Sequence, residues 1–211
     1  MSVLELKAFE AAPVTEAPFQ HLILRDFVKG KAFDEAIADY PEIKQGGSFP
    51  VFTQKPGPGL QRLLDALNQD DFRQAVERKF GVDLSGRPTM TTLRGRARSK
   101  DGQIHTDSKT KLVTVLLYLN RATNDWENHA GCLRILNGPE SLDNYAAEAP
   151  PVDGTVVVFP CVPNAWHGHE PFEGKRRVIQ LNWVTDQGVV EREQKRHAVS
   201  AFFKGILPAR M

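Results

Sequence analysis

The sequence predicts a mostly β protein with flanking helices, in which antiparallel strands form a sandwich or jelly-roll barrel. From residue 91 onward, seven short β-branched segments bounded by turn residues follow one another without an intervening helix. Ahead of them, apolar residues recur at helical spacing in two stretches. The length of 211 residues suits one domain, and 25% charged residues is ordinary globular composition. We therefore expect a single domain over residues 1–211.

Residues 1–89 are expected to form the helical part of this domain. Residues 21–27 predict a short strand, and residues 31–40 a helix that ends before Pro41, because proline cannot continue a helix. Apolar residues recur at helical spacing from Leu60 to Phe80, in one or two segments. The stretch 46–59 between these helices is rich in glycine and proline and predicts an irregular loop. This loop is either a lid over the site or a passive connection.

Residues 90–185 are expected to form the β core, and residues 186–211 a closing segment with an amphipathic helix over 190–203. Strands separated by short turns pair antiparallel, because parallel pairing needs long crossover connections. The predicted strands lie at residues 91–99, 102–107, 111–120, 131–136, 154–160, 164–169 and 176–184.

Charge and cysteine content exclude several classes of protein. Lys and Arg number 27 against 26 Asp and Glu, and a net charge of +1 gives no global attraction to nucleic acid or to a membrane surface. Cys132 and Cys161 are the only cysteines, too few for a disulfide framework or a thiolate zinc site, which favours the reducing cytoplasm. No apolar window is long enough to span a bilayer, and Glu5 and Glu10 stand where a signal peptide would be apolar.

The first pattern with chemical meaning is His105-Thr106-Asp107. Strand alternation would place His105 and Asp107 on one face, about 7 Å apart at their Cα atoms, so both side chains could reach one metal ion. His167 and His169 close a later predicted strand. Two histidines and one carboxylate are the ligand set of non-haem Fe(II) oxygenases. The alternative is that His-x-Asp arises by chance, and that each histidine packs in the core or faces solvent.

Arg177 lies ten residues beyond His167, at the start of the last predicted strand. A turn at residues 171–174 would return it toward the strand that carries His167. A guanidinium near a metal could clamp the far carboxylate of a dicarboxylate cosubstrate in bidentate fashion. The alternative is a surface arginine beside Lys175 and Arg176.

With these residues in place, the sequence resembles the 2-oxoglutarate- and Fe(II)-dependent oxygenases, in particular their prolyl-hydroxylase-like branch. The family pattern is His-x-Asp, a long gap, a His, and a basic residue about ten positions on. The surrounding segments agree: VTVLLYLN after His-x-Asp, GCLRIL after a Trp-containing loop, DGTVVVFP before the distal His and RRVIQLNW after it. The resemblance implies a double-stranded β-helix (jelly-roll) core with the N-terminal helices packed on its major sheet.

The resemblance also implies roles for individual residues. Arg177 would bind the distal carboxylate of 2-oxoglutarate, Tyr118 would hydrogen-bond the same carboxylate, and Leu133 would line the cosubstrate pocket. Relatives often have a hydroxyl residue four positions after the Arg, where this chain has Leu181, so the carboxylate needs another donor. The implied iron ligands are His105, Asp107 and His167.

The implied enzyme is a dioxygenase that hydroxylates an unactivated C–H bond and releases succinate and CO2. Its cofactor would be Fe(II), its cosubstrate 2-oxoglutarate, and ascorbate a stimulating reductant. Its partner would be a small molecule, a glycan or a protein side chain, and its oligomeric state stays open. Two rival classes are a cupin-type metalloprotein that does not use 2-oxoglutarate and a non-catalytic interaction module on the same fold.

Two assignments in this pattern have a neighbouring competitor. His169 shares a strand face with His167, but its spacing to Arg177 is eight residues instead of ten. This favours His167 as the ligand and His169 as a neighbouring or substrate-facing group. Arg176 competes with Arg177 for the clamp, and the family's Arg-to-Trp spacing, counted to Trp183, selects Arg177.

Arg94, Arg96 and Arg98 recur at period two in a predicted strand, which would place three guanidiniums on one face. If that face looks into the barrel mouth, the substrate is anionic. The alternative is a solvated strand face. Aromatic residues are not interleaved with these arginines, so single-stranded nucleic acid is not expected as a partner.

Overall fold

The computed structural model describes residues 2–123, 126 and 129–193. Residues 187–193 are helical, and the rest of the helix predicted over 190–203 lies outside the described residues. The elements in chain order are α1 (Leu6–Ala11), β1 (Leu22–Leu24), α2 (Gly30–Ala38), β2 (Phe49–Pro50), the 3-10 helix η1 (Val51–Thr53), α3 (Pro58–Leu67), α4 (Asp70–Phe80), β3 (Thr89–Ala97), β4 (Lys111–Tyr118), β5 (Leu133–Leu136), β6 (Tyr145–Ala149), β7 (Val156–Pro160), β8 (His167–His169) and β9 (Gly174–Val184).

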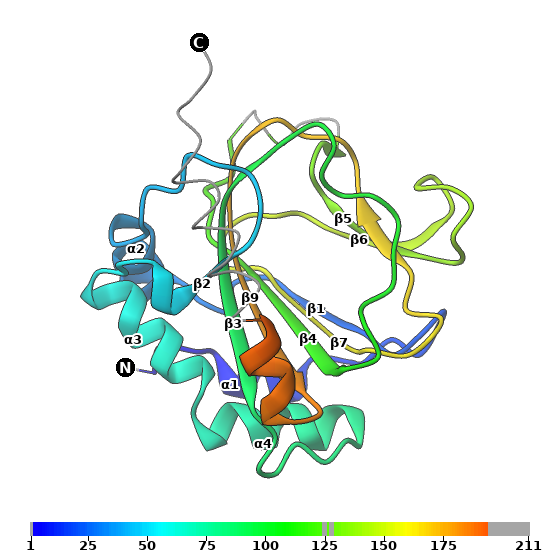
Figure 1. Ribbon diagram of the computed structural model, residues 1–211, viewed down its shortest axis with the longest axis horizontal. Helices are drawn as coiled ribbons and strands as arrows, with labels where there is room; N and C mark the ends of the chain where they lie inside the picture. Colours follow the sequence, from blue (N-terminus) through cyan, green and yellow to red (C-terminus); the bar gives the residue numbers. More distant parts are fainter. Residues whose placement is uncertain (1, 124–125, 127–128, 194–211) are drawn as a thin grey trace.

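The strands form two facing sheets (Figure 1). The major sheet has the order β1-β7-β4-β9-β3-β2, and the minor sheet has the order β6-β5-β8. All pairs between these strands are antiparallel, as expected for strands joined by short connections. The fold is the predicted one: a mostly β jelly-roll core with helices packed on one face of its major sheet.

The helices cover the outer face of the major sheet because each presents an apolar stripe to it. In α3 this stripe is Leu60, Leu63, Leu64 and Leu67, all buried. In α4 the ring of Phe72 lies 6.0 Å from that of Trp183 on β9, measured between centroids. Figure 1 shows α1, α3 and α4 lying against this side of the sheet. The larger hydrophobic core of the described chain lies here, between helices and sheet.

A smaller apolar cluster lies between the two sheets and includes Tyr118, Leu133 and Val178. Side chains along β9 alternate between the two cores, as they must in a strand. Ile179, Leu181 and Trp183 pack against the helices, whereas Val178 packs between the sheets. This alternation decides which residues of β9 can reach a site inside the sandwich.

Several local expectations need correction. Residues 102–107 do not form a strand of the sheets, and the backbone there is held by one antiparallel bridge between His105 and His167. Residues 46–59 are not wholly irregular, because β2 pairs with β3 and η1 follows it. The strand β6 (Tyr145–Ala149) was not expected from the sequence, because four of its five residues are alanine or glutamate, which have little β propensity. Within the described residues, no helix has the length and apolar character that crossing a membrane requires.

Candidate active site

A cavity of about 130 Å³ lies between the sheets and contains most of the predicted site residues. The strands β3, β4 and β9 of the major sheet form one wall, and β5 and β8 of the minor sheet form the other. The residues that line it include Arg94, His105, Asp107, Lys111, Thr114, Leu116, Tyr118, Leu133, His167, His169, Arg176, Val178 and Gln180. A site enclosed by two sheets can exclude water from whatever it binds.

His105, Asp107 and His167 come together at one end of this cavity. Each offers one ligand atom, and these atoms lie within 4.8 Å of one another. The backbone holds the histidines in place, because each donates its N–H to the other's carbonyl at 3.0 Å. The structure therefore brings these three residues together as the sequence predicted, although His105 is held by an isolated bridge and not by a strand.

Hydrogen bonds orient the two imidazole rings. His105 Nδ1 lies 2.8 Å from the Gln103 carbonyl oxygen, and His167 Nδ1 lies 2.9 Å from that of Ala165. A carbonyl oxygen only accepts, so Nδ1 must carry the proton, and Nε2 keeps its lone pair free in each neutral ring. Burial, together with the adjacent His105, lowers the pKa of His167 to about 4, so His167 is neutral near pH 7. Neutral imidazole is the form that binds a metal ion.

The Asp107 carboxylate is ionised in this setting. Burial raises its pKa, but the ammonium of Lys111 and the hydroxyl of Thr114 outweigh burial and hold the pKa below its usual value. Lys111 Nζ lies 2.5 Å from one carboxylate oxygen, and Thr114 Oγ1 donates to the other at 2.5 Å. Asn182 in turn donates to Thr114 Oγ1 at 2.7 Å. The donor set of two imidazoles and one carboxylate thus fits a divalent metal such as Fe(II).

Thr114, Asn182 and Gln180 were missed by the sequence reasoning. The signal was present, since Thr114 lies four residues before Tyr118 on β4, and Gln180 and Asn182 lie two and four residues after Val178 on β9. Each therefore shares a strand face with a residue that lines the cavity.

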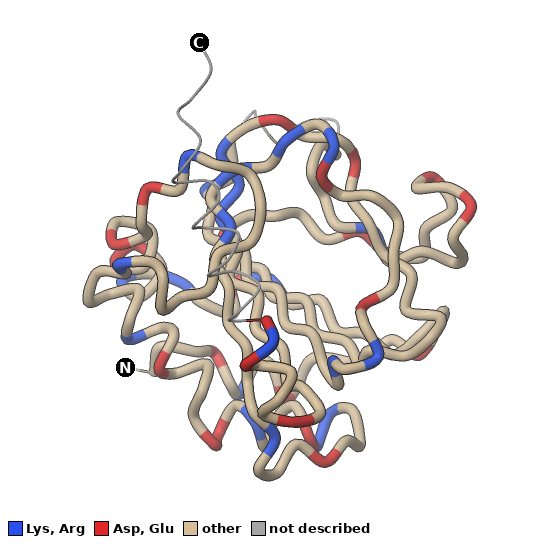
Figure 2. Tube along the Cα trace, in the orientation of Figure 1, with Lys and Arg blue, Asp and Glu red and all other residues tan. Residues whose placement is uncertain are grey.

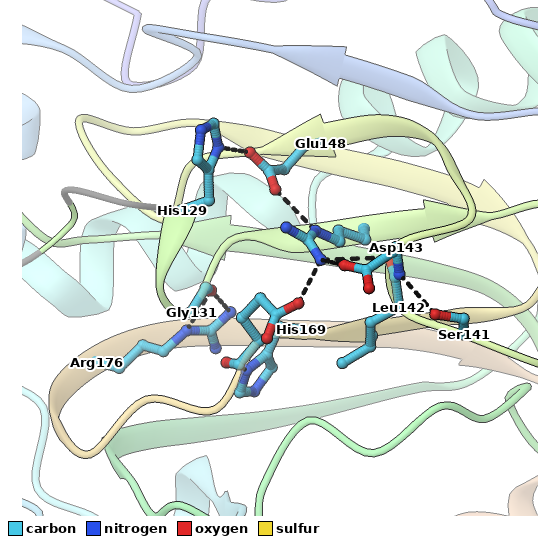
Figure 3. Close-up of polar contacts among 10 residues, drawn as sticks. His129, Gly131, Ser141, Leu142, Asp143, Glu148, His169 and Arg176 are labelled. Atoms are coloured by element: carbon cyan, nitrogen blue, oxygen red, sulfur yellow. Dashed lines mark hydrogen bonds and ion pairs between the residues drawn. The ribbon is translucent and has the colours of Figure 1, made fainter.

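Arg176 and Tyr118 lie together in the cavity wall. Arg176 is 6% exposed, and its Nε and Nη2 donate to the Gly131 carbonyl at 3.1 and 2.9 Å (Figure 3). Its guanidinium carbon lies 5.2 Å from the centroid of the Tyr118 ring. Tyr118 is fully buried, yet its hydroxyl has no hydrogen-bond partner among the described residues. Since a buried polar group without a partner is costly, this hydroxyl fits a site for a ligand oxygen.

Arg177 does not lie in this cavity, contrary to the sequence prediction. It is on the other face of β9, where its guanidinium carbon lies 5.6 Å from the centroid of the Tyr40 ring. The spacing argument failed because a one-residue difference in position reverses the face of a strand residue. Arg176, the competitor in the sequence, is the arginine that reaches the cavity. The position four residues beyond Arg176 is Gln180, which also lines it.

The three arginines at period two do not share one face either. Arg94 lines the cavity, but the pairing of β3 with β9 shifts by one residue between Arg94 and Arg96. This irregularity turns Arg96 to the opposite face, and Arg98 pairs with Asp101 at 2.8 Å near the end of the strand. Only the first arginine of the run can therefore contact a molecule bound between the sheets.

His169 and Leu133 both line the cavity. His169 is 8% exposed, and burial, with the adjacent Arg176, lowers its pKa to about 4. His169 Nδ1 donates to the Glu170 carbonyl at 2.8 Å. It does not join the group formed by the other two histidines and the aspartate, the one such cluster among the described residues. The four-ligand arrangement of a cupin-type site is thus not assembled here.

A jelly-roll with two histidines and one carboxylate in its cavity is the architecture of a non-haem iron oxygenase. The model of the 2OG-Fe(II) oxygenase superfamily matches residues 95–185, which include the whole triad. Over these residues the chain is similar to the members of this superfamily. It is a 2-oxoglutarate-dependent dioxygenase with Fe(II) and 2-oxoglutarate as cofactor and cosubstrate.

Solved structures show the same fold at low sequence identity. A prolyl-4-hydroxylase from Pseudomonas putida superposes with a TM-score of 0.60 and 16% identity, over 84% of this chain and 99% of that one. A prolyl hydroxylase from Trichoplax adhaerens, solved with a peptide of the hypoxia inducible factor oxygen degradation domain, gives a TM-score of 0.51 and 15% identity, over 85% and 86% of the two chains. No curated protein matches the sequence at a significant level.

Proposed function

We propose that this oxygenase hydroxylates an unactivated C–H bond of its substrate and releases succinate and CO2, with His105, Asp107 and His167 as the iron ligands. The observation that carries this proposal is the convergence of three ligand atoms within 4.8 Å. Bound Fe(II) would supply the oxygen activation, with three coordination positions left for cosubstrate and oxygen. The chain's own contribution is to turn both imidazoles correctly, to hold His167 neutral and to keep Asp107 ionised.

The cosubstrate's distal carboxylate is assigned to Arg176 and Tyr118. Two observations support this assignment: Arg176 is the buried guanidinium in the wall, and the Tyr118 hydroxyl beside it has no other partner among the described residues. Arg176 and Tyr118 would each donate a hydrogen bond to this carboxylate and so fix one end of 2-oxoglutarate. The keto acid end would then lie toward His105, Asp107 and His167. The apolar side chains of Leu116, Leu133 and Val178 line the same cavity and would exclude water from it.

An anionic substrate remains part of the proposal, now resting on Arg94 alone. Arg94 and Arg176 face the same cavity, and burial, together with Arg176, lowers the pKa of Arg94. One distal carboxylate needs one guanidinium, which leaves Arg94 to attract a carboxylate or phosphate on the substrate. The substrate class, whether small molecule, glycan or protein side chain, is open, and the two unpaired cysteines favour a reducing compartment such as the cytoplasm.

The test measures succinate formation from 2-oxoglutarate with Fe(II), in wild type and in His105→Ala and Asp107→Ala. We expect both variants to abolish iron-dependent turnover. His105→Ala should unfold at a temperature close to that of wild type, because the His105 side chain is exposed, whereas Asp107→Ala should be less stable, because it leaves Lys111 without its partner. Turnover that persists in either variant would remove the triad from the mechanism. A chain that binds Fe(II) without consuming oxygen or 2-oxoglutarate under any condition would instead be a non-catalytic module.

A further inference from the structure

A second cavity, of about 420 Å³, lies outside the sandwich where residues 40–44 pass over β3 and β9. Its floor includes Gly95, where a Cβ atom would come within 2.6 Å of the Ile43 side chain, so glycine lets this segment lie close to the strand. Pro41 and Ile43 supply apolar wall. The charged residues of its described lining are Glu42, Lys44, Arg96, Lys175 and Arg177.

The backbone places these cations on the outer face of the sheet. Arg96 pairs with Lys175 beyond the register shift, so both side chains turn away from the catalytic cavity. Arg177 joins them because it follows Arg176, which occupies the inner face of the same strand. Figure 2 shows Lys and Arg gathered along these ends of β3 and β9. The cavity is therefore separated from the catalytic one by the sheet itself.

The cations in this cavity are poorly balanced by acidic groups. Lys44 lies 3.7 Å from Glu42, and both side chains are largely exposed, so this pair contributes little. Among the described residues, no carboxylate lies within ion-pair distance of Arg96, Lys175 or Arg177. Arg177 is half-buried over the Tyr40 ring, and burial lowers its pKa. A partly desolvated guanidinium without a carboxylate partner gains most from an incoming anion.

We propose that this cavity binds a small organic anion, with Arg96 and Arg177 holding its phosphate or carboxylate group and Pro41 and Ile43 contacting its apolar part. Guanidinium groups bind both kinds of acid in bidentate fashion. The cavity volume is in the range of small-molecule sites, about 300–1,000 Å³. This site does not depend on the iron site, because it uses none of the residues assigned to cosubstrate or metal.

The test is calorimetric titration of the full chain with phenyl phosphate, phenylacetate and benzyl alcohol at low salt. The three probes share an aromatic ring and differ in the acid, so they separate a phosphate source from a carboxylate source and from apolar binding alone. The variants are Arg177→Gln and Arg96→Gln, and Arg96 is exposed enough to be changed without harm to folding. The matched controls are Arg176→Gln, on the inner face of the same strand, and Lys31→Gln, an exposed charge elsewhere.

We expect at least one anion to bind, and each cavity variant to weaken it about tenfold or more, equivalent to about 1.4 kcal/mol. Both controls should stay within about twofold of wild type. Tighter binding of phenyl phosphate would assign the site to phosphate compounds, and tighter binding of phenylacetate to carboxylates. The proposal is overturned if neither anion binds better than benzyl alcohol, or if Arg176→Gln weakens binding as much as the cavity variants, since the anion would then occupy the catalytic cavity.

Discussion

At the scale of single residues, the chemistry depends on which face of a strand each side chain occupies. Arg176 and Arg177 are adjacent in sequence, yet one lines the catalytic cavity and the other the outer cavity. They therefore form a matched pair for mutation: both are arginines on the same strand, and their side chains lie on opposite faces of the sheet.

Arg176→Leu should weaken 2-oxoglutarate binding strongly, because it would leave the cosubstrate's distal carboxylate buried without its charged partner. The expected cost is about 2–5 kcal/mol, or roughly thirtyfold to several thousandfold in cosubstrate affinity. The KM for 2-oxoglutarate measures it. Arg177→Leu is the control and should leave this KM within a fewfold of wild type. A larger effect at Arg177 would contradict the assignment and restore the spacing argument.

Tyr118→Phe removes only a hydroxyl that has no partner among the described residues. Without cosubstrate, the change should leave the melting temperature unchanged or raise it, because a buried unpaired hydroxyl costs about 1–3 kcal/mol. Cosubstrate affinity should fall about tenfold, because a hydrogen bond to a carboxylate is lost. Thermal unfolding and a binding titration check the two expectations separately. Loss of stability in the cosubstrate-free protein would show that the hydroxyl already has a structural partner.

Arg94→Gln should raise the substrate KM and flatten its dependence on ionic strength, because Arg94 would attract the substrate's acidic group. The substrate must first be found, by screening cell extract for a product that has gained one oxygen atom. Decay of 2-oxoglutarate without substrate should stay unchanged. Arg96→Gln is the control, because its side chain lies on the other face. A neutral substrate that is indifferent to salt and to Arg94→Gln would end the hypothesis of an anionic substrate.

At the scale of elements, close packing of connecting segments holds the sheet edges in place. Gly154, just before β7, has φ +66°, and a Cβ there would lie 1.9 Å from the Val28 carbonyl oxygen. Its N–H donates to the Tyr118 carbonyl at 3.1 Å, and its own carbonyl accepts from Phe27. The residue thus joins the segment after β1 to the end of β4, the strand that carries Tyr118.

Gly154→Ala should destabilise the fold by about 2–5 kcal/mol, since it adds a steric clash with backbone to the strain of a left-handed conformation. Gly86→Ala is a matched control, because Gly86 has φ +67° but open space around its Cβ position. It should cost only about 1 kcal/mol. Chemical denaturation gives both values, and equal effects would mean that backbone strain alone accounts for the loss.

At the scale of the whole molecule, the helices and the catalytic cavity lie on opposite faces of one sheet. The helix-side core is joined to β9 through Phe72, which contacts Phe9, Phe27 and Trp183 with ring centroids 5.6–6.0 Å apart. The residues that stabilise the fold and the residues of the catalytic cavity therefore lie on different faces of the same strands. A substitution in the helix-side core should change the free energy of unfolding much more than it changes metal or cosubstrate binding.

Phe72→Ala should cost about 3–5 kcal/mol, because it leaves a cavity in the larger core. For a chain of this size that lowers the melting temperature by about 6–20 °C. Phe52→Ala is the control, since Phe52 is 64% exposed, and it should leave the melting temperature nearly unchanged. Metal binding measured well below the transition should persist in both variants. Loss of metal binding in folded Phe72→Ala would show that the helices also shape the site.

The sequence by itself determined the class of fold, the resemblance to the family, and the three residues His105, Asp107 and His167 that the structure brings together. These follow from local patterns: β-branched segments between turns, amphipathic helices, and His-x-Asp with a distal histidine. The resemblance to the family also pointed to Tyr118 and Leu133, and both line the cavity.

Only the tertiary structure decided which arginines face the cavity. One residue of register shift between β3 and β9 separates Arg94 from Arg96, and strand parity separates Arg176 from Arg177. Spacing along the chain does not contain this information, because register is set by pairing with a strand some 80 residues away in sequence. For the same reason, the outer cavity could be found only after the fold had placed residues 40–44 over β3 and β9.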